Sequence, residues 1–225
     1  MRFIGSKKLL LKNIEYAIIQ NIDDWENLKI FCDIFGGTGC VGYNFKKYYS
    51  VISNDILFFS YAIQKSRIEL NQEPTFSKLK PLIKSDPLDY MNNNSLESFN
   101  SNFVYENFSP NKKSNRMYLT NSNALRIDQF RQNLNHWLKN SYINQTEYFY
   151  ILSSIIQAVP FVSNIAGTYG AFLKFWDKRS FKKIYLEKPE IYDNKRENFV
   201  FNDDSNKLIN QIEGDILYID PPYNS

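Results

Sequence analysis

The chain has 225 residues, of which 43% are hydrophobic and 23% charged, a composition that excludes wholesale disorder and allows one large domain or a domain with an insert. Its formal net charge of +3 permits an anionic partner without demanding one. Two cysteines and one histidine exclude a cysteine/histidine zinc site of the usual kind, and we expect neither a disulfide framework nor any metal site.

The amino terminus is expected to form an amphipathic helix and not a signal peptide, because Lys8, Lys12 and Glu15 interrupt its apolar stretches. No apolar run approaches the roughly 20 residues of a membrane helix, so we expect a cytoplasmic protein without membrane contact. The 16 Tyr and 18 Phe could serve as stacking platforms for bases. However, Phe and Tyr are abundant together with Asn, Lys and Ile, as AT-rich codons would produce, so composition alone does not argue for nucleic acid.

The first region, residues 1–70, alternates between helix and strand patterns. Apolar residues at helical spacing follow Ser6, and a short apolar run at 28–35 is closed by glycines. A helix is then expected from about Cys40, a strand at 51–55 and a helix over 56–70. This order is typical of a parallel, doubly wound α/β sheet.

The middle region, residues 71–198, loses that rhythm. Prolines and a polar stretch punctuate it, and helical periodicity returns near 124–138 and 147–159. We interpret it as a mainly helical insert with its own small core. Residues 199–225 resume the sheet with a strand, a short helix and a final strand.

A glycine loop, DIFGGTGCVG, follows the first strand and brings together Asp33, Phe35, Gly36, Gly37 and Gly39. Glycine lets the backbone turn tightly or approach a ligand, although a simple strand–helix turn would also use it.

An acid, Asp55, closes the second strand, where open α/β folds place the partner of ribose hydroxyls. Dinucleotide and S-adenosylmethionine folds share the glycine loop and this acid. The loop departs from the GxGxxG pattern of phosphate binding, and the Asp33 carboxylate would suit a methionine ammonium group. The pattern therefore favours S-adenosylmethionine as cofactor.

The last strand delivers the sequence DPPY, from Asp220 through Pro221 and Pro222 to Tyr223. Consecutive prolines stiffen the backbone, so the Asp220 carboxylate and the Pro221 carbonyl could accept both hydrogens of an exocyclic amine. Holding that amine positions its nitrogen for attack on an electrophilic methyl group and stabilises developing positive charge. Tyr223 could stack on a planar base. An ordinary strand-ending turn is the alternative, but an acid and an aromatic residue flanking the prolines make catalysis the favoured reading.

The chain resembles the D12 class of adenine-N6 DNA methyltransferases, in an order like that of the alpha group that includes the Dam methylases. It is most similar to the amino-terminal half of FokI-type methylases of type IIS restriction–modification systems. The motifs that carry the resemblance are RFIGSK, DIFGGTG, SND and DPPY, and the longer stretches are SNDILFFSY, RMYLTNSNALRIDQFR, SNIAGTYGAFLKFWDKR and GDILYIDPPYN.

The resemblance implies a Rossmann-like S-adenosylmethionine-dependent methyltransferase fold. Residues 1–70 would be its cofactor-binding part, 71–198 a target-recognition insert, and 199–225 the return to the methyltransferase domain. Phe3 and Lys7 match cofactor-contacting positions, Asp55 the ribose acid, and Asp220 the catalytic acid near the cofactor. Asp204 falls near the expected place of the cofactor adenine, with Asp203 as a competitor.

The insert is expected to read DNA through the stretch SNIAGTYGAFLK, which resembles a DNA-contacting hairpin of Dam-type enzymes. Asn164 is expected to reach base edges and Lys174 a phosphate, with Gly167 and Tyr169 in the same loop. A tight structural turn is an equal alternative. Arg116, Arg126 and Arg131 lie on segments that could face phosphate, although each alone is expected to be a solvated charge.

We therefore expect site-specific methylation of a flipped adenine in double-stranded DNA that carries a short recognition site. The family implies a cognate restriction endonuclease in the same system, without a stable complex. An RNA adenine methyltransferase and a non-catalytic DNA- or cofactor-binding remnant are the alternatives. The sheet is expected to be incomplete at the carboxyl terminus, as in a truncated chain, so that residues 1–225 alone would bind DNA weakly and methylate poorly or not at all.

Overall fold

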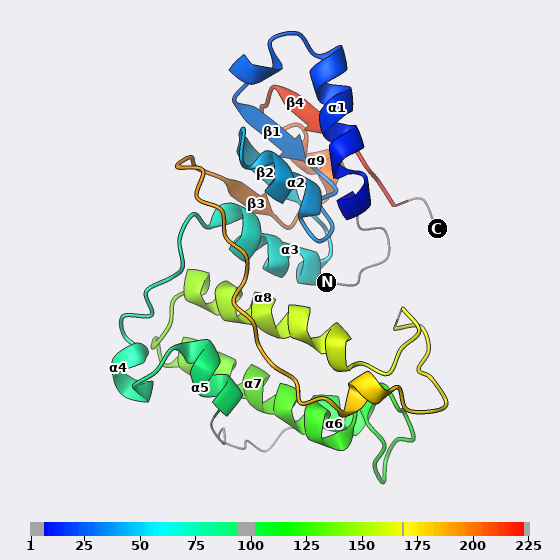
Figure 1. Ribbon diagram of the computed structural model, residues 1–225. Coiled ribbons are helices and arrows are strands. Elements are labelled where there is room, and N and C mark those ends of the chain that lie inside the picture. The colour runs from blue at the N-terminus through cyan, green and yellow to red at the C-terminus, as the bar shows by residue number, and fades with distance from the viewer. Residues whose placement is uncertain (1–6, 94–101, 168, 223–225) are drawn as a thin grey trace. The chain divides into compact units, whose positions relative to one another are not determined.

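The computed structural model describes residues 7–93, 102–167 and 169–222 and is shown in Figure 1. The chain divides into two compact units. The described residues 7–73 and 189–222 form one, which we call the sheet unit, and those between 74 and 188 form the other, the helical unit.

The sheet unit alternates strands with helices, as its hydrophobic pattern predicts. Its strands are β1 (Ile30–Asp33), β2 (Ser50–Asn54), β3 (Phe199–Phe201) and β4 (Ile216–Tyr218). Its α-helices are α1 (Leu11–Asn21), α2 (Cys40–Phe45), α3 (Phe58–Gln64) and α9 (Ser205–Leu208). Short 3₁₀ turns cover Lys7–Leu9 and Trp25–Asn27, and a π-helical turn, Lys65–Glu69, extends α3.

The four strands form one parallel sheet in the order β3-β2-β1-β4. The direction of winding reverses beside β1, since the chain moves outward to β2 and β3 and then returns to place β4 on the other side. Ligands of open α/β sheets bind at such a reversal, outside the carboxyl ends of the strands. The fold is thus the Rossmann-like α/β class expected from the sequence.

One face of the sheet carries the core of this unit. Phe31 pairs in register with Val51 on one side and with Ile216 on the other, and all three are buried. Helices α1 and α2 lie over this face, and Phe45 of α2 stacks on Phe31 with ring centroids 4.4 Å apart. This packing fixes β1 and the loop that follows it.

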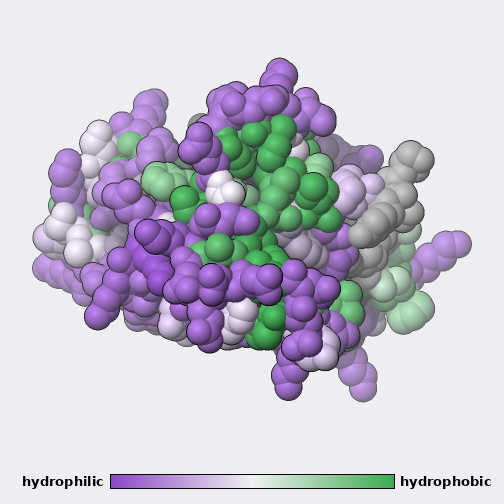
Figure 2. Space-filling model, turned by 90° about the horizontal axis from the view of Figure 1, so that it is seen from above, coloured by the Kyte–Doolittle hydropathy of each residue, from purple (hydrophilic) through white to green (hydrophobic). Residues whose placement is uncertain are grey.

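The opposite face is less covered. Leu217 pairs with Cys32 and is 45% exposed, and Phe199 pairs with Ile52 and is 47% exposed. Apolar side chains therefore remain at the surface of the protein. Figure 2 shows one view of that surface, in which apolar residues gather into a continuous area bordered by hydrophilic ones.

The helical unit is built around a helical hairpin. Its elements are α4 (Lys80–Ile83), α5 (Pro87–Asn93), α6 (Phe103–Phe108), α7 (Asn121–Lys139), α8 (Gln145–Val162) and a 3₁₀ turn, Lys178–Phe181. Thr120 caps α7, and Asn144 with Glu147 forms a capping box at the start of α8. A five-residue connection makes α7 and α8 run side by side in opposite directions (Figure 1). Among the described residues, no helix has the length and apolar character needed to cross a bilayer.

The segment 189–198 differs from the sequence-based expectation, which assigned it to the insert. The structure places it in the sheet unit, because Asn198 accepts a hydrogen bond from the Val51 amide at 3.0 Å. Asn194 also donates to the Tyr49 carbonyl at 2.9 Å. The functional division of the chain that the sequence suggested stays a prediction.

Candidate active site

Three chemically distinctive segments meet at the carboxyl edge of the sheet. The glycine loop follows β1, Asp55 follows β2, and the DPP sequence follows β4. Asp33, the last residue of β1, pairs in register with Ser53 of β2 and with Tyr218 of β4. Since the strands are parallel, the segments that follow them lie at one edge, at the reversal of winding described above.

The glycine loop is held against β2 and α3. The Gly36 amide donates to the Asn54 carbonyl at 2.8 Å, and Gln64 donates to the Gly37 carbonyl at 2.8 Å. Gln64 also accepts a hydrogen bond from Ser53 at 2.7 Å, and both of these side chains are fully buried. The loop is therefore a braced structure and not merely a flexible turn.

Gly36 and Gly37 make a matched pair for testing this bracing. A Cβ at Gly36 would lie 2.6 Å from the Ser53 hydroxyl oxygen and 2.8 Å from Gln64 Nε2, whereas one at Gly37, where φ is +53°, would meet nothing within 4 Å. Gly36→Ala is expected to lower the free energy of unfolding by about 3 kcal/mol through overpacking. Gly37→Ala is expected to cost about 1 kcal/mol through its positive φ alone. Urea unfolding of both variants measures the difference, and equal costs would contradict the braced loop.

Asp55 is tied to the glycine loop by its carboxylate. One oxygen accepts the Gly37 amide at 2.8 Å, and the other accepts the Leu57 amide at 2.8 Å. Partial burial raises the pKa of Asp55, and these two amides oppose that rise. Each carboxylate oxygen can accept a second hydrogen bond, so the group can still take a ligand hydroxyl.

Asp33, the last residue of β1, is 1% exposed. Neither carboxylate oxygen has a hydrogen bond of good geometry within the described ranges, although the amides of Gly42 and Phe35 lie close enough to lower its pKa. Burial is the largest effect and raises the pKa of Asp33 to about 7, helped by the negative charges of Asp220 and Asp55. The carboxyl groups of Asp33, Asp55 and Asp220 thus lie close enough for the charges of Asp55 and Asp220 to raise the pKa of Asp33. The Asp33 carboxyl is buried and has no hydrogen-bond partner within the described ranges.

Asp220 forms an ion pair with Lys7, with Nζ 2.7 Å from Oδ2. The two side chains are 14% and 21% exposed, so the pair is partly shielded from water. Two residues that the sequence assigned to one site, one near each end of the chain, are therefore in contact. Pro221 and Pro222 follow at the surface, whereas Tyr223 and Phe3, also predicted site residues, lie outside the described residues.

Asp204 caps α9. Its carboxylate accepts hydrogen bonds from the backbone amide and the side chain of Asn206 at 2.9 Å and 3.0 Å. Asp203 accepts the Asp204 amide at 2.7 Å. Both acids lie just after β3, near the same sheet edge, and a role for either beside the cofactor stays a prediction.

Sequence reasoning missed two residues that position the site. Gln64 braces the glycine loop, as described above. The fully buried Asn54 donates to the carbonyls of Ile34 and Asp203 at 3.2 Å and 3.0 Å, which joins the segments after β1, β2 and β3. Two signals in the sequence could have found them. Gln64 is a polar residue on the buried side of α3, and Asn54 is an amide residue immediately before Asp55.

Asn164, expected to reach base edges, is fully buried in the helical unit. Its amide nitrogen donates to the Leu173 carbonyl at 3.0 Å, and its amide oxygen accepts the Asp177 amide at 2.9 Å. Both polar atoms are thus used to hold the 163–177 stretch together. The structure therefore corrects the expectation for this residue and assigns the side chain a role inside the protein.

The other predicted DNA contacts lie on the same stretch. Gly167, Tyr169 and Lys174 are exposed, and Gly167 has φ +143° with open space around it. The Tyr169 ring stacks near Tyr118, and its hydroxyl shares a 2.9 Å hydrogen bond with Ser163. These three residues remain available to a partner.

Replacing Asn164 by alanine is expected to lower the free energy of unfolding of the helical unit by about 2–4 kcal/mol. The reason is that the change leaves the Leu173 carbonyl and the Asp177 amide unpaired in a partly buried place, at a cost of about 1–2 kcal/mol each. Denaturant unfolding followed by tryptophan fluorescence measures it. An unchanged stability, together with weaker DNA binding, would instead restore Asn164 as a DNA contact.

Comparison with known proteins gives a consistent result. A family model described as D12 class N6 adenine-specific DNA methyltransferase matches residues 3–225. The chain is 50% identical over 224 residues to Type II methyltransferase M.FokI of Planomicrobium okeanokoites, covering 100% of this chain and 34% of that protein. It is 44% identical over 225 residues to Modification methylase StsI of Streptococcus sanguinis, with 100% and 34% covered.

A third relative, Type II methyltransferase M.NlaIII of Neisseria lactamica, is 32% identical over 229 residues, which cover 100% of this chain and 65% of that protein. The chain thus spans about a third of the length of the first two relatives. No solved structure matches the chain.

Proposed function

The chain belongs to the D12 class of N6 adenine-specific DNA methyltransferases, and we propose that it holds the methyl donor and the reacting adenine of a site-specific DNA methyltransferase in a restriction–modification system. The donor is S-adenosylmethionine, and the acceptor is double-stranded DNA with a short recognition site. The observation that carries this proposal is the convergence of the glycine loop, Asp55 and the Lys7–Asp220 pair at one edge of the sheet.

The residues at this edge fit the donor. Open space beside Gly37 lets a ligand approach the loop backbone, and Asp55 retains acceptor capacity for ribose hydroxyls. The buried Asp33 carboxyl lacks a partner within the described ranges, so a nearby cationic group such as the donor's ammonium would stabilise its charged form. Phe3, Lys7, Phe35, Gly36, Gly39 and Asp204 are the further residues proposed to surround the donor.

S-adenosylmethionine supplies, when bound, an electrophilic methyl group on its sulfonium. The Asp220 carboxylate and the Pro221 carbonyl would accept the two hydrogens of the adenine amino group. This grip fixes the direction of the nitrogen lone pair and stabilises the positive charge that develops on nitrogen. Lys7 acts as a positioning residue, because its 2.7 Å ion pair restricts the orientation of the Asp220 carboxylate.

The adenine must leave the duplex to reach this grip, since its amino group is otherwise base-paired. We propose that the helical unit contacts the DNA, with Gly167, Tyr169 and Lys174 as candidate contacts. Pro222 and Tyr223 complete the proposed adenine site, the ring of Tyr223 stacking on the base. A cognate endonuclease that recognises the same sequence is the proposed partner in the cell.

The test is a methyl-transfer assay on the protein expressed from its natural gene. Duplex DNA and RNA of the same sequence are incubated with isotopically labelled S-adenosylmethionine, and the nucleosides are separated by mass spectrometry. The proposal expects labelled N6-methyladenine from DNA only. Label on RNA adenine would favour the RNA methyltransferase reading, and absence of label from both would leave a non-catalytic protein.

A further inference from the structure

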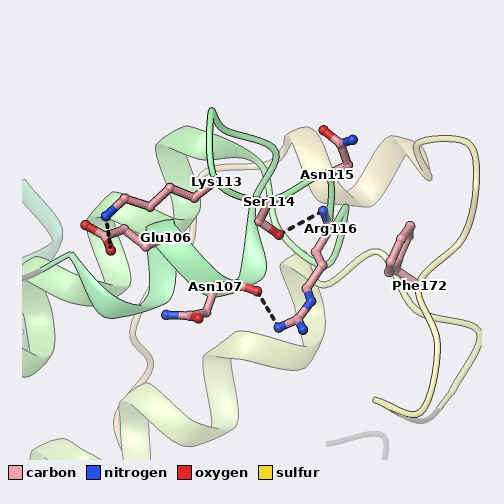
Figure 3. Close-up of a pocket in the computed structure, with 7 residues that line it drawn as sticks. All are labelled: Glu106, Asn107, Lys113, Ser114, Asn115, Arg116 and Phe172. Atoms are coloured by element: carbon pink, nitrogen blue, oxygen red, sulfur yellow. Dashed lines mark hydrogen bonds and ion pairs between the residues drawn. The ribbon is translucent and has the colours of Figure 1, made fainter.

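The helical unit contains an open pocket of about 400 Å³ (Figure 3). Its walls come from the last turn of α6, from the loop 113–116 that follows, and from Phe172. Nearly all of the lining side chains are polar or charged. Such a lining suits a small polar group and not an apolar ligand.

The loop that forms one wall is held rigidly. The Asn111 amide nitrogen donates to the carbonyls of Tyr105 and Ser109, each at 2.8 Å, and its oxygen accepts the Lys113 amide at 2.7 Å. The Asn111 and Ser114 backbones also pair with each other. This turn therefore presents the residues that follow it in a fixed geometry, which a binding site requires.

Arg116 supplies the cationic group of the pocket. Its backbone amide donates to the Ser114 hydroxyl at 3.2 Å, and its Nη1 donates to the Asn107 carbonyl at 3.3 Å (Figure 3). Within the described ranges its other guanidinium N–H groups have no hydrogen-bond partner. Arg116 is thus oriented from two points while most of its donors remain available.

Charge and further donors in the pocket favour an anion. Lys113 is paired with Glu106 at 2.9 Å, so those two charges largely cancel and the Arg116 charge is left over. The exposed side-chain amide of Asn115 has no hydrogen-bond partner in the part of the chain that the structure describes. A monoanion with several acceptor oxygens matches one guanidinium and one free amide.

The pocket is continuous with the stretch that carries the predicted DNA contacts. Phe172 lines it and forms a β-bridge with Ile165, within the same stretch as Gly167, Tyr169 and Lys174. Tyr118, two residues after Arg116, has its ring 5.2 Å from that of Phe172. The 113–116 loop and the 163–177 stretch therefore form one surface.

We propose that this pocket binds a phosphodiester group of the DNA backbone, with Arg116 as its anchoring cation and Asn115 as an additional donor. This inference rests on the proposed function, since it takes duplex DNA to be the partner. The pocket would fix the register of the duplex on the helical unit without reading its sequence. In this proposal the 113–116 loop anchors the DNA backbone. The sequence alone had led us to expect Arg116 to be a solvated charge.

The test compares Arg116→Gln with a matched control, Lys139→Ala, in the protein expressed from its natural gene. Gln keeps a donor for the Asn107 carbonyl but removes the charge. Lys139 is an exposed cation at the far end of α7, about 27 Å from its first residue at 1.5 Å per residue. The probe is a 20-base-pair duplex of arbitrary sequence, and its affinity is measured by fluorescence anisotropy over a range of salt concentrations.

Arg116→Gln is expected to reduce the slope of log affinity against log salt by about 0.9 and the affinity at 0.1 M salt by roughly eightfold, equally for all duplex sequences. Arg116→Lys should retain the slope, and Lys139→Ala should change neither quantity.

Equal slopes for Arg116→Gln and wild type, with circular dichroism showing both folded, would overturn the phosphate site alone. The phosphate site would also be overturned if Arg116→Gln weakened binding of a poly-glutamate competitor but left binding of DNA unchanged. Failure of the wild-type chain to bind duplex DNA in a salt-dependent manner would overturn the proposed DNA partner as well.

Discussion

Replacing Asp220 by alanine is expected to reduce methyl transfer by at least about 10²-fold, on the scale of losing one preorganised group that stabilises transition-state charge. The carboxylate sits at the end of β4 beside Lys7, and the proposed mechanism uses it to grip the adenine amino group. Since Asp220 lies beyond the paired residues of β4, which end at Tyr218, the fold should survive its loss. Single-turnover assays with saturating donor and DNA on the protein expressed from its natural gene measure the chemical step directly.

Two controls make this result specific. Asp23→Ala removes an exposed carboxylate from the sheet unit at a place before β1 and should leave the rate unchanged. Asp220→Asn keeps one acceptor oxygen but breaks the ion pair with Lys7, so its rate should fall between those of wild type and alanine. Loss of donor or DNA binding that fully accounts for the Asp220→Ala defect would argue for a structural role in place of a catalytic one.

Replacing Asp33 by asparagine is expected to remove the largest pH dependence of stability in the sheet unit. Because its folded-state pKa is raised from 3.8 to about 7, the folded protein retains a proton between these pH values that the unfolded chain has released. The free energy of unfolding should therefore fall as pH rises through this window and level off above about 7, by an amount on the order of 4 kcal/mol. Asp33→Asn should flatten that part of the curve, as measured by urea unfolding from pH 4 to 8.

The same substitution tests the proposed donor site through binding. If a donor ammonium lies near Asp33, binding favours the ionised carboxyl, so affinity for S-adenosylmethionine should rise with pH through about 7 in the wild-type chain. In Asp33→Asn this increase should disappear, and affinity at pH 8 should be lower. Calorimetric titrations with parallel pH profiles for the two chains would mean that Asp33 is buried for reasons unrelated to the donor.

Much of the sheet unit follows from local sequence. Alternating apolar runs and the glycines after Asp33 were sufficient to predict β1, α2 and β2, because these features determine backbone conformation within a few residues. The convergence of Asp55 and Asp220 also followed, since acids at the ends of parallel strands must lie at one edge.

The residues that sequence reasoning missed or misread act through long-range contacts. Asparagine is abundant here and was attributed to codon bias, yet Asn54, Asn92, Asn123 and Asn164 are all buried and hydrogen-bonded to distant backbone. Whether an asparagine faces solvent or joins two segments depends on tertiary packing, which no short window contains. The same reason explains the misreading of Asn164, because a polar residue just before a glycine-containing loop looks exposed until the chain folds around it.

In the proposed mechanism the donor and an extruded adenine meet at the carboxyl edge of the sheet, with Asp220 holding the adenine amino group. The most direct measurement is a crystal structure of the protein bound to S-adenosylhomocysteine and a duplex containing its recognition site. We expect the ligand sulfur above Gly36–Gly39 and the flipped adenine N6 at hydrogen-bond distance, about 3 Å, from an Asp220 carboxylate oxygen. An adenine held elsewhere, with Asp220 still paired to Lys7 and remote from the base, would contradict it.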